Sequence, residues 1–128
     1  MTGAPSVIDR ELGRLEGLWS DGLSDSYRSY LDAVQDHAAD KQQQLALAAA
    51  LVEVGLKLQG LGDRAAPPVE LLMGDLCLAR SSRILTDAAT RAVQIAFSKA
   101  VEELSGAAAA DMEAPPVRTL IIKALQAT

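Results

Sequence analysis

The stretch from Pro67 to Leu85, PPVELLMGDLCLARSSRIL, constrains the fold of this chain most, because it joins a helix-start signal to dense apolar content. Pro68 suits the first position of a helix, where its missing amide proton would have no partner in any case. Apolar side chains then recur along more than one stripe of the helix. Such a helix is too apolar for a surface. We therefore expect it either at the centre of a bundle or packed between its own chain and a partner chain.

The rest of the chain also has helical character. Alternating runs of Val, Ile and Thr are absent, and aromatic residues make up only 3% of the sequence. We expect one all-α domain over residues 1–128, a single bundle of five or six helices with the helix from Pro68 to Leu85 at its centre. The other expected helices cover about 6–19, 24–37, 40–61 and 90–105, and a short one follows Pro116.

Two glycines bear on these helices. Gly55 lies in the middle of an expected helix, where it costs about 1 kcal/mol relative to Ala, so we expect a neighbouring helix to cross there. Gly106 is a candidate stop for the helix at 90–105, although the alanines at 107–110 leave an extension open.

Charge and composition exclude several classes of function. The net charge is −5 and the basic residues are scattered, which argues against nucleic acid as a partner. Cys77 is the single cysteine, so the chain has no intrachain disulfide and no zinc site of several thiolates, and we interpret it as a small core residue. His37 stands near a helix end and is interpreted as a surface or capping residue without chemistry.

No segment predicts secretion or membrane insertion. The first residues lack a basic region followed by an apolar stretch, so we infer no signal peptide. The most apolar window, residues 45–58, contains Glu53 and Lys57 and is shorter than the roughly 20 residues that span a bilayer. We expect a cytoplasmic protein with no transmembrane segment.

The run from Val52 to Leu85 resembles the middle of a trans-type polyprenyl diphosphate synthase. In that family, a helix with a glutamate ends in an aspartate-rich DDxxD motif, and a helix of pattern LxGDxLLAxA follows after a loop. Glu53 matches the glutamate, Asp63 matches the first motif aspartate, and LMGDLCLAR at 72–80 matches the second pattern. The stretch FSKAVEELS at 97–105 also resembles the family's next helix. The resemblance implies that part of the bundle is isoprenoid-synthase-like.

The carboxylates that catalysis needs in that family are missing here. The family holds Mg²⁺ against the substrate diphosphate with two aspartate-rich clusters, but the first of these places reads Asp63-Arg64-Ala65-Ala66-Pro67. No second motif follows, since Asp111 and Glu113 are isolated acids late in the chain. We expect no catalytic, cofactor-binding or metal-binding residue in this chain, and Mg²⁺ only in a catalytic partner.

These features favour a noncatalytic regulatory small subunit, similar to the short component of two-component hexaprenyl or heptaprenyl diphosphate synthases. It would support the activity and the product chain length of a catalytic large subunit. A stripe of four residues, or the stripe next to it, would face that partner: Met73, Cys77, Arg80 and Ile84.

Two alternatives of other classes stay open. One is a helical homo-oligomeric scaffold or regulatory protein without prenyl chemistry, and the other is an independent enzyme, for which no recognisable catalytic constellation is present. The Gly74-Asp75 pair also has a purely structural interpretation. Gly74 would then allow close helix packing, while Asp75 would cap a helix or pair within the chain.

Overall fold

The computed structural model describes residues 22–59, 68–109 and 116–128, and these residues form five helices and no strand. The helices are α2 (Ser24–Ala33), α3 (Ala39–Leu58), α4 (Pro68–Ala88), α5 (Arg91–Ala109) and α6 (Val117–Leu125). The all-α class expected from the sequence is confirmed. The helix expected at 6–19 lies outside the described residues.

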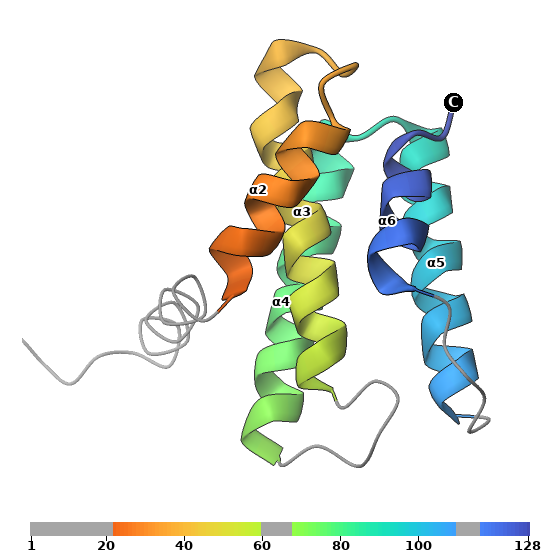
Figure 1. The fold of residues 1–128 in the computed structure, drawn as a ribbon. Coiled ribbons are helices and arrows are strands. Elements are labelled where there is room, and N and C mark those ends of the chain that lie inside the picture. The colour runs from red at the N-terminus through yellow and green to blue at the C-terminus, as the bar shows by residue number, and fades with distance from the viewer. Residues whose placement is uncertain (1–21, 60–67, 110–115) are drawn as a thin grey trace, which may run out of the picture.

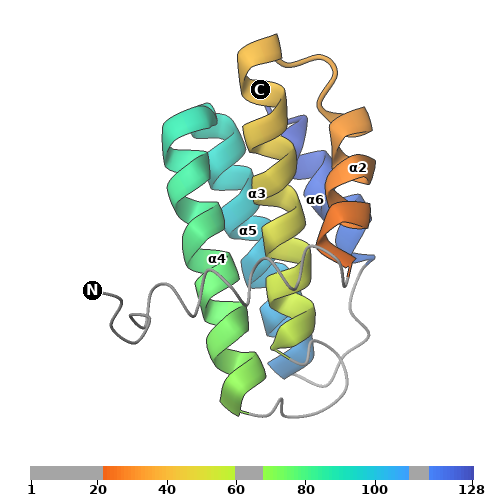
Figure 2. The same cartoon turned by 90° about the vertical axis from the view of Figure 1, so that its left-hand side faces the viewer.

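The central helix is α3, and the expectation that α4 is central is wrong. Helix α3 packs against α2, α4 and α6 (Figure 1), and the turned view shows it between α4 on one side and α2 on the other (Figure 2). Four alanines of α3 are fully buried, Ala46, Ala48, Ala49 and Ala50. Their small side chains let neighbouring helices approach α3 from several sides, whereas α4 carries exposed Arg80 and Arg83 on its outer side.

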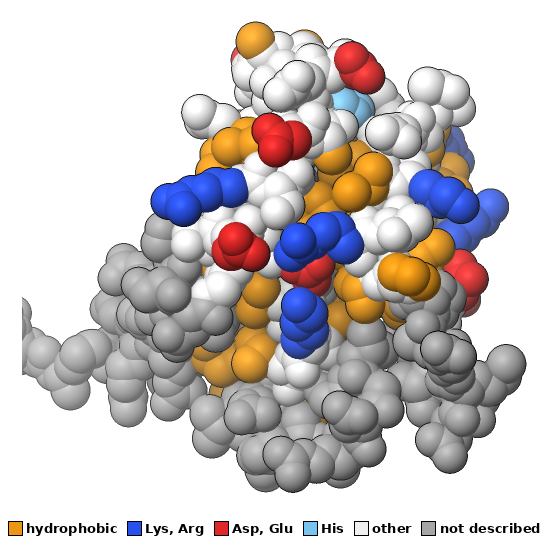
Figure 3. Space-filling view, viewed as in Figure 1, with side chains coloured by type: hydrophobic (Ala, Val, Ile, Leu, Met, Phe, Trp, Pro, Cys, Tyr) orange, Lys and Arg blue, Asp and Glu red, His pale blue; other side chains and the backbone are white. Residues whose placement is uncertain are grey.

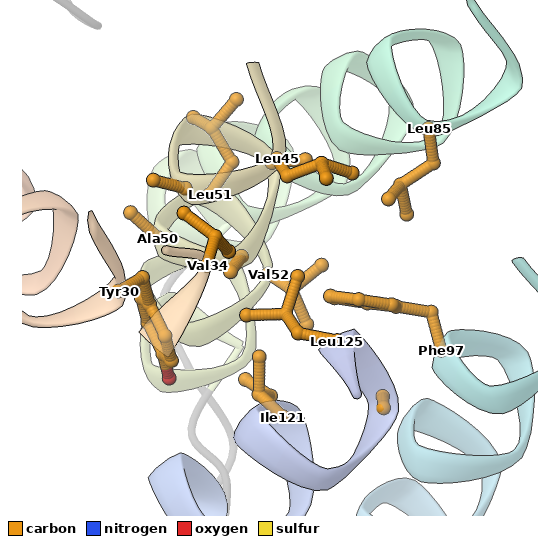
Figure 4. Packing of buried hydrophobic residues seen from close by; sticks show 14 of the residues in the cluster. Tyr30, Val34, Leu45, Ala50, Leu51, Val52, Leu85, Phe97, Ile121 and Leu125 are labelled. Atoms are coloured by element: carbon orange, nitrogen blue, oxygen red, sulfur yellow. The ribbon is translucent and has the colours of Figure 1, made fainter. Parts of the chain in front are cut away.

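One cluster of buried apolar side chains joins all five helices (Figure 4). Tyr30 and Val34 reach it from α2, Leu85 from α4 and Phe97 from α5. From α6, the side chains of Ile121 and Leu125 complete it, and both are fully buried. The close-up shows Phe97 pointing from α5 toward Val52 and Leu125. The five helices therefore share one common hydrophobic core.

Helices α3 and α4 cross closely at two glycines. A β-carbon placed on Gly55 would lie 3.1 Å from the β-carbon of Cys77 and 3.1 Å from the carbonyl oxygen of Gly74. The crossing expected at Gly55 is therefore confirmed, and its partner is α4. This crossing buries the side of α4 that carries Gly74 and Cys77, and Cys77 is 0% exposed.

Helices α5 and α6 form an antiparallel hairpin that stands apart from α4 (Figure 1). Only Ala89 and Thr90 separate α4 from α5. The amide of Ala89 donates to the carbonyl oxygen of Leu85 at 2.9 Å, and the hydroxyl of Thr90 accepts from the amide of Val93 at 3.2 Å. The first contact extends α4 by one hydrogen bond, and the second caps the start of α5.

Helix α5 does not stop at Gly106, as one reading of the sequence suggested, but continues to Ala109. Nothing lies within 4 Å of a β-carbon placed on Gly106. The glycine is therefore an ordinary exposed helix position here, and the alanines that follow it favour continuation of the helix.

Candidate functional site

A buried carboxylate lies at the junction of α2, α3 and α6. Glu53 is 2% exposed, and its carboxylate accepts hydrogen bonds from Ser26 and Tyr30 of α2. Tyr30 Oη lies 3.1 Å from Glu53 Oε1. Arg118 of α6 forms a two-pronged ion pair with the same carboxylate, through Nε at 3.1 Å and Nη2 at 3.0 Å, and its Nη1 donates to Ser29 Oγ at 3.3 Å. We call these five residues the Glu53 cluster.

The electrostatics of the Glu53 cluster keep its carboxylate charged. Burial raises the pKa of Glu53, but the hydrogen bonds from Arg118 and Ser26, with the nearby charge of Lys57, lower it by more, so the net pKa lies below its ordinary 4.5. Burial and the charge of Glu53 raise the pKa of Tyr30 far above its ordinary 10.0. The hydrogen bond to Glu53 also raises the pKa of Arg118. On the face of the molecule drawn in Figure 3, basic side chains lie next to an acidic one near the middle of the view.

The Glu53 cluster suits a structural role better than a catalytic one. Its carboxylate is fully engaged by Arg118, Ser26 and Tyr30, so it has no free lone pair to take a proton from a substrate. The guanidinium is engaged as well, and it lies 5.8 Å from the centre of the Tyr30 ring. Within the described residues, no group of three or more His, Cys, Asp or Glu side chains is placed to hold a metal ion.

A groove of about 630 Å³ lies between α4 and α5. Among the described residues, its apolar lining comes from all three neighbouring helices: Val52 of α3, Leu78 and Leu85 of α4, and Phe97 and Val101 of α5. Ser, Thr, Gln and Glu side chains of α4 and α5 complete it. Ser81 is 3% exposed, and its hydroxyl donates to the carbonyl oxygen of Leu78 at 2.7 Å. The groove therefore offers an apolar surface whose one buried hydroxyl is already satisfied.

The outer side of α4 is the second surface without a partner in the described chain. Leu72 is 50% exposed there, and Leu71, the next position around the helix, is 41% exposed. Among the described residues, Ile95 of α5 is the other large apolar side chain that is exposed to this extent. Leu76 is half-buried and Ala79 is exposed along the same stripe as Leu72. This stripe is the one next to the four residues named from the sequence.

Those four residues do not share one exposed surface. Cys77 is buried against Gly55 of α3, Met73 is buried, Ile84 is half-buried, and Arg80 is exposed. For Cys77 the reason is geometric, since Gly55 of α3 lets the side of α4 that carries Gly74 and Cys77 pack against its own chain. Of the two stripes considered, the structure leaves the one with Leu72, Leu76 and Ala79 available to a partner.

The residues that carry the family resemblance have structural partners here. Gly74 faces Gly55 at the helix crossing, and Asp75 accepts a hydrogen bond of 2.5 Å from Gln59 Nε2. Both contacts agree with the structural interpretation of this pair. Asp63, like Asp111 and Glu113, lies outside the described residues.

His37 lies between α2 and α3 and caps the end of α6. Its Nε2 lies 2.7 Å from the carbonyl oxygen of Leu125, the last residue of α6. A carbonyl oxygen only accepts, so Nε2 carries the proton. Of the two interpretations made from the sequence, surface or capping, this contact supports capping, but the helix capped is α6, 88 residues away along the chain.

Sequence reasoning missed the Glu53 cluster as a unit. One signal was available, because Glu53 lies inside the most apolar window of the chain, where an acid needs a buried partner. The partner was not identifiable, since Arg118 lies 65 residues away and looks like any surface arginine in a short helix.

Comparison of the chain with protein-family models, with curated proteins and with solved structures finds no match. Among the described residues, no helix combines the length and the apolar content needed to cross a membrane.

Proposed function

We propose that this chain is a noncatalytic subunit that binds a catalytic polyprenyl diphosphate synthase through the outer side of α4. The observation that carries the proposal is Leu72, which is 50% exposed and shares a stripe with Leu76 and Ala79 on a helix whose other side is packed against α3. Exposed apolar side chains that line up on one helix face are typical of a protein interface. The partner class comes from the resemblance of α4 to the second helix pattern of that family.

The outer side of α4 has the chemistry of a helix-packing surface. Leu72, Leu76 and Ala79 follow one another at spacings of four and three residues, so they form one stripe. The small side chain of Ala79 permits a close approach, and exposed Arg80 and Arg83 would form a charged rim. Burying such a patch contributes about 25 cal/mol per Å², before the costs of association are subtracted.

Control of product length is the second part of the proposal. The groove borders the inner edge of α4, so a partner seated on α4 would lie close to it. The resemblance implies that a growing prenyl tail runs beside such an interface, where side chains limit its length. Mg²⁺ and the catalytic aspartates would belong to the partner, and the complex would be cytoplasmic.

Co-expression with a catalytic synthase tests the proposal. The candidate is a chain with two DDxxD motifs encoded by a neighbouring reading frame. We expect the two chains to co-purify and the partner's products to change in length when this chain is present. Ala79→Phe should shift the product length rather than stop catalysis. Identical products with and without this chain, together with no co-purification, would reject the proposal.

Self-association is the second candidate, and one observation favours it. The stripe Leu72, Leu76, Ala79, Arg83 has spacings of four, three and four residues, which read the same in both directions. Two copies of α4 packed antiparallel would therefore set Leu76 of one copy against Ala79 of the other. A purified chain that is dimeric by light scattering and does not bind the synthase would support this scaffold function instead.

A further inference from the structure

Helix α6 is fixed at both ends by side chains from other parts of the chain. Near its start, Arg118 binds Glu53 of α3 and Ser29 of α2. At its end, the carbonyl oxygen of Leu125 binds His37, which lies between α2 and α3. A helix of nine residues is not stable alone. The position of α6 therefore depends on these contacts and on the buried side chains between them.

The position of α5 depends in turn on α6. Helix α5 packs along α6, while the groove separates it from α4 (Figure 1). Three of its side chains, Val93, Phe97 and Leu104, belong to the common core. Of these, Phe97 points from α5 toward Val52 and Leu125 (Figure 4). Its covalent link to α4 is the short turn at Ala89 and Thr90. Residues at the ends of helices, as in this turn, are where hinge motions are usually absorbed.

We propose that the α5–α6 hairpin is a hinged wall of the groove, and that the two polar contacts of α6 form the latch that holds this wall in place. With both contacts made, the groove has the volume seen here. When they break, the hairpin turns about Ala89 and Thr90, and the groove widens. The latch acts whatever partner binds α4, because none of its residues lies on the outer side of that helix.

The latch has a built-in preference for the closed state. The side chain of Arg118 is 40% exposed, so water can solvate its guanidinium after release. Glu53 is 2% exposed, and losing the arginine would leave its charge buried with only two hydroxyl donors. The buried charge of Glu53 therefore opposes opening of the latch, whereas Arg118 can leave the ion pair at little cost. A contact of this kind can break and re-form.

A distance measurement across the groove tests the proposal. Nitroxide labels are placed at Ser82→Cys on α4 and Ser98→Cys on α5, two exposed groove residues, in a full-length chain that also carries Cys77→Ala. Pulsed electron paramagnetic resonance then gives the distance distribution between the labels. We expect one narrow population in this parent and an added longer-distance population in Arg118→Met and in His37→Phe. Lys123→Met changes an exposed residue of the same helix and should leave the distribution unchanged.

Amide hydrogen exchange provides the second readout. In Arg118→Met, amides of α5 and α6 should exchange about tenfold faster, while those of α4 and the first half of α3 keep their rates. If the label distances do not change, or if all five helices gain exchange equally, the hinged wall is wrong. Should Arg118→Met fail to fold, Arg118→Lys and His37→Phe carry the same comparison, because each weakens one contact of the latch and keeps the other.

Discussion

Gly55 of α3 and Gly74 of α4 face each other where the two helices cross, and a β-carbon placed on Gly74 would lie 2.8 Å from the carbonyl oxygen of Gly55. The same β-carbon would lie 2.5 Å from Cγ of Gln59. The side chain of Gln59 can move aside, but a backbone oxygen inside a helix cannot. Close packing therefore explains why α4 has glycine at this position, whatever its ancestry.

Substitution of this glycine should destabilise the fold. We expect Gly74→Ala to lower the free energy of unfolding by roughly 1–2 kcal/mol, because overpacking costs more than the gain in helix propensity returns. Gly106→Ala is the matched control, since its β-carbon would meet nothing within 4 Å, and it should raise stability by up to about 1 kcal/mol. Urea unfolding followed by circular dichroism measures both. Equal stabilisation of the two variants would contradict the close crossing.

The same crossing makes Cys77 inert in the folded chain. The side chain is fully buried, and burial raises the pKa of its thiol to about 11. At pH 8 the folded chain should therefore react with a thiol reagent far more slowly than the chain in 6 M urea does, because both the thiolate fraction and the access are small. The absorbance of the chromophore that the thiol reagent releases measures the reaction rate of the folded and of the unfolded chain. A native rate close to the unfolded one would place Cys77 on the surface.

The ion pair between Glu53 and Arg118 should couple two helices energetically. We expect Arg118→Met to cost roughly 2–3 kcal/mol, somewhat below the usual loss for breaking a buried pair, because the arginine is partly exposed. Glu53→Leu removes the buried charge itself, so the double variant should recover part of the loss. Denaturant unfolding of the four proteins of this cycle measures the coupling. Strictly additive effects would mean that the pair contributes nothing.

Acid should weaken the fold through the same carboxylate. The pKa of Glu53 in the folded chain lies below its ordinary 4.5, so the contribution of this group is complete above that value and is lost as the pH falls toward the folded pKa. Stability of the parent should therefore drop below about pH 4.5 more steeply than that of Glu53→Gln. Unfolding curves between pH 3 and 7 test the difference. Parallel pH profiles for the two proteins would show that Glu53 has an unshifted pKa.

Local sequence patterns predicted the helices well but not their places in the bundle. Pro68 marked the start of α4, because proline is favoured at the first position of a helix. Gly55 marked a crossing, because a glycine inside a helix is usually explained by a close neighbour. The choice of the central helix failed, since hydrophobic content favoured α4 while the buried alanines of α3 decided the packing. Arg118 was not predictable, because only the folded chain brings it to Glu53.

Single substitutions on α4 separate its inner and outer sides. Leu72 is 50% exposed, so Leu72→Glu should leave the stability of the isolated chain nearly unchanged and weaken binding to the catalytic partner about tenfold or more. Met73 is adjacent but 7% exposed, so Met73→Glu would bury a charge and unfold the chain before it reported on any interface.

Ile95→Glu is the matched control for the outer side of α4. Ile95 is 46% exposed on α5, so the substitution adds the same charge to an apolar surface of similar exposure on a different helix. Co-purification measures binding to the synthase, and light scattering measures self-association. If α4 is the interface in either assembly, Leu72→Glu disrupts it and Ile95→Glu does not. Equal loss in the two variants would mean that added charge, rather than the outer side of α4, disturbs the assembly.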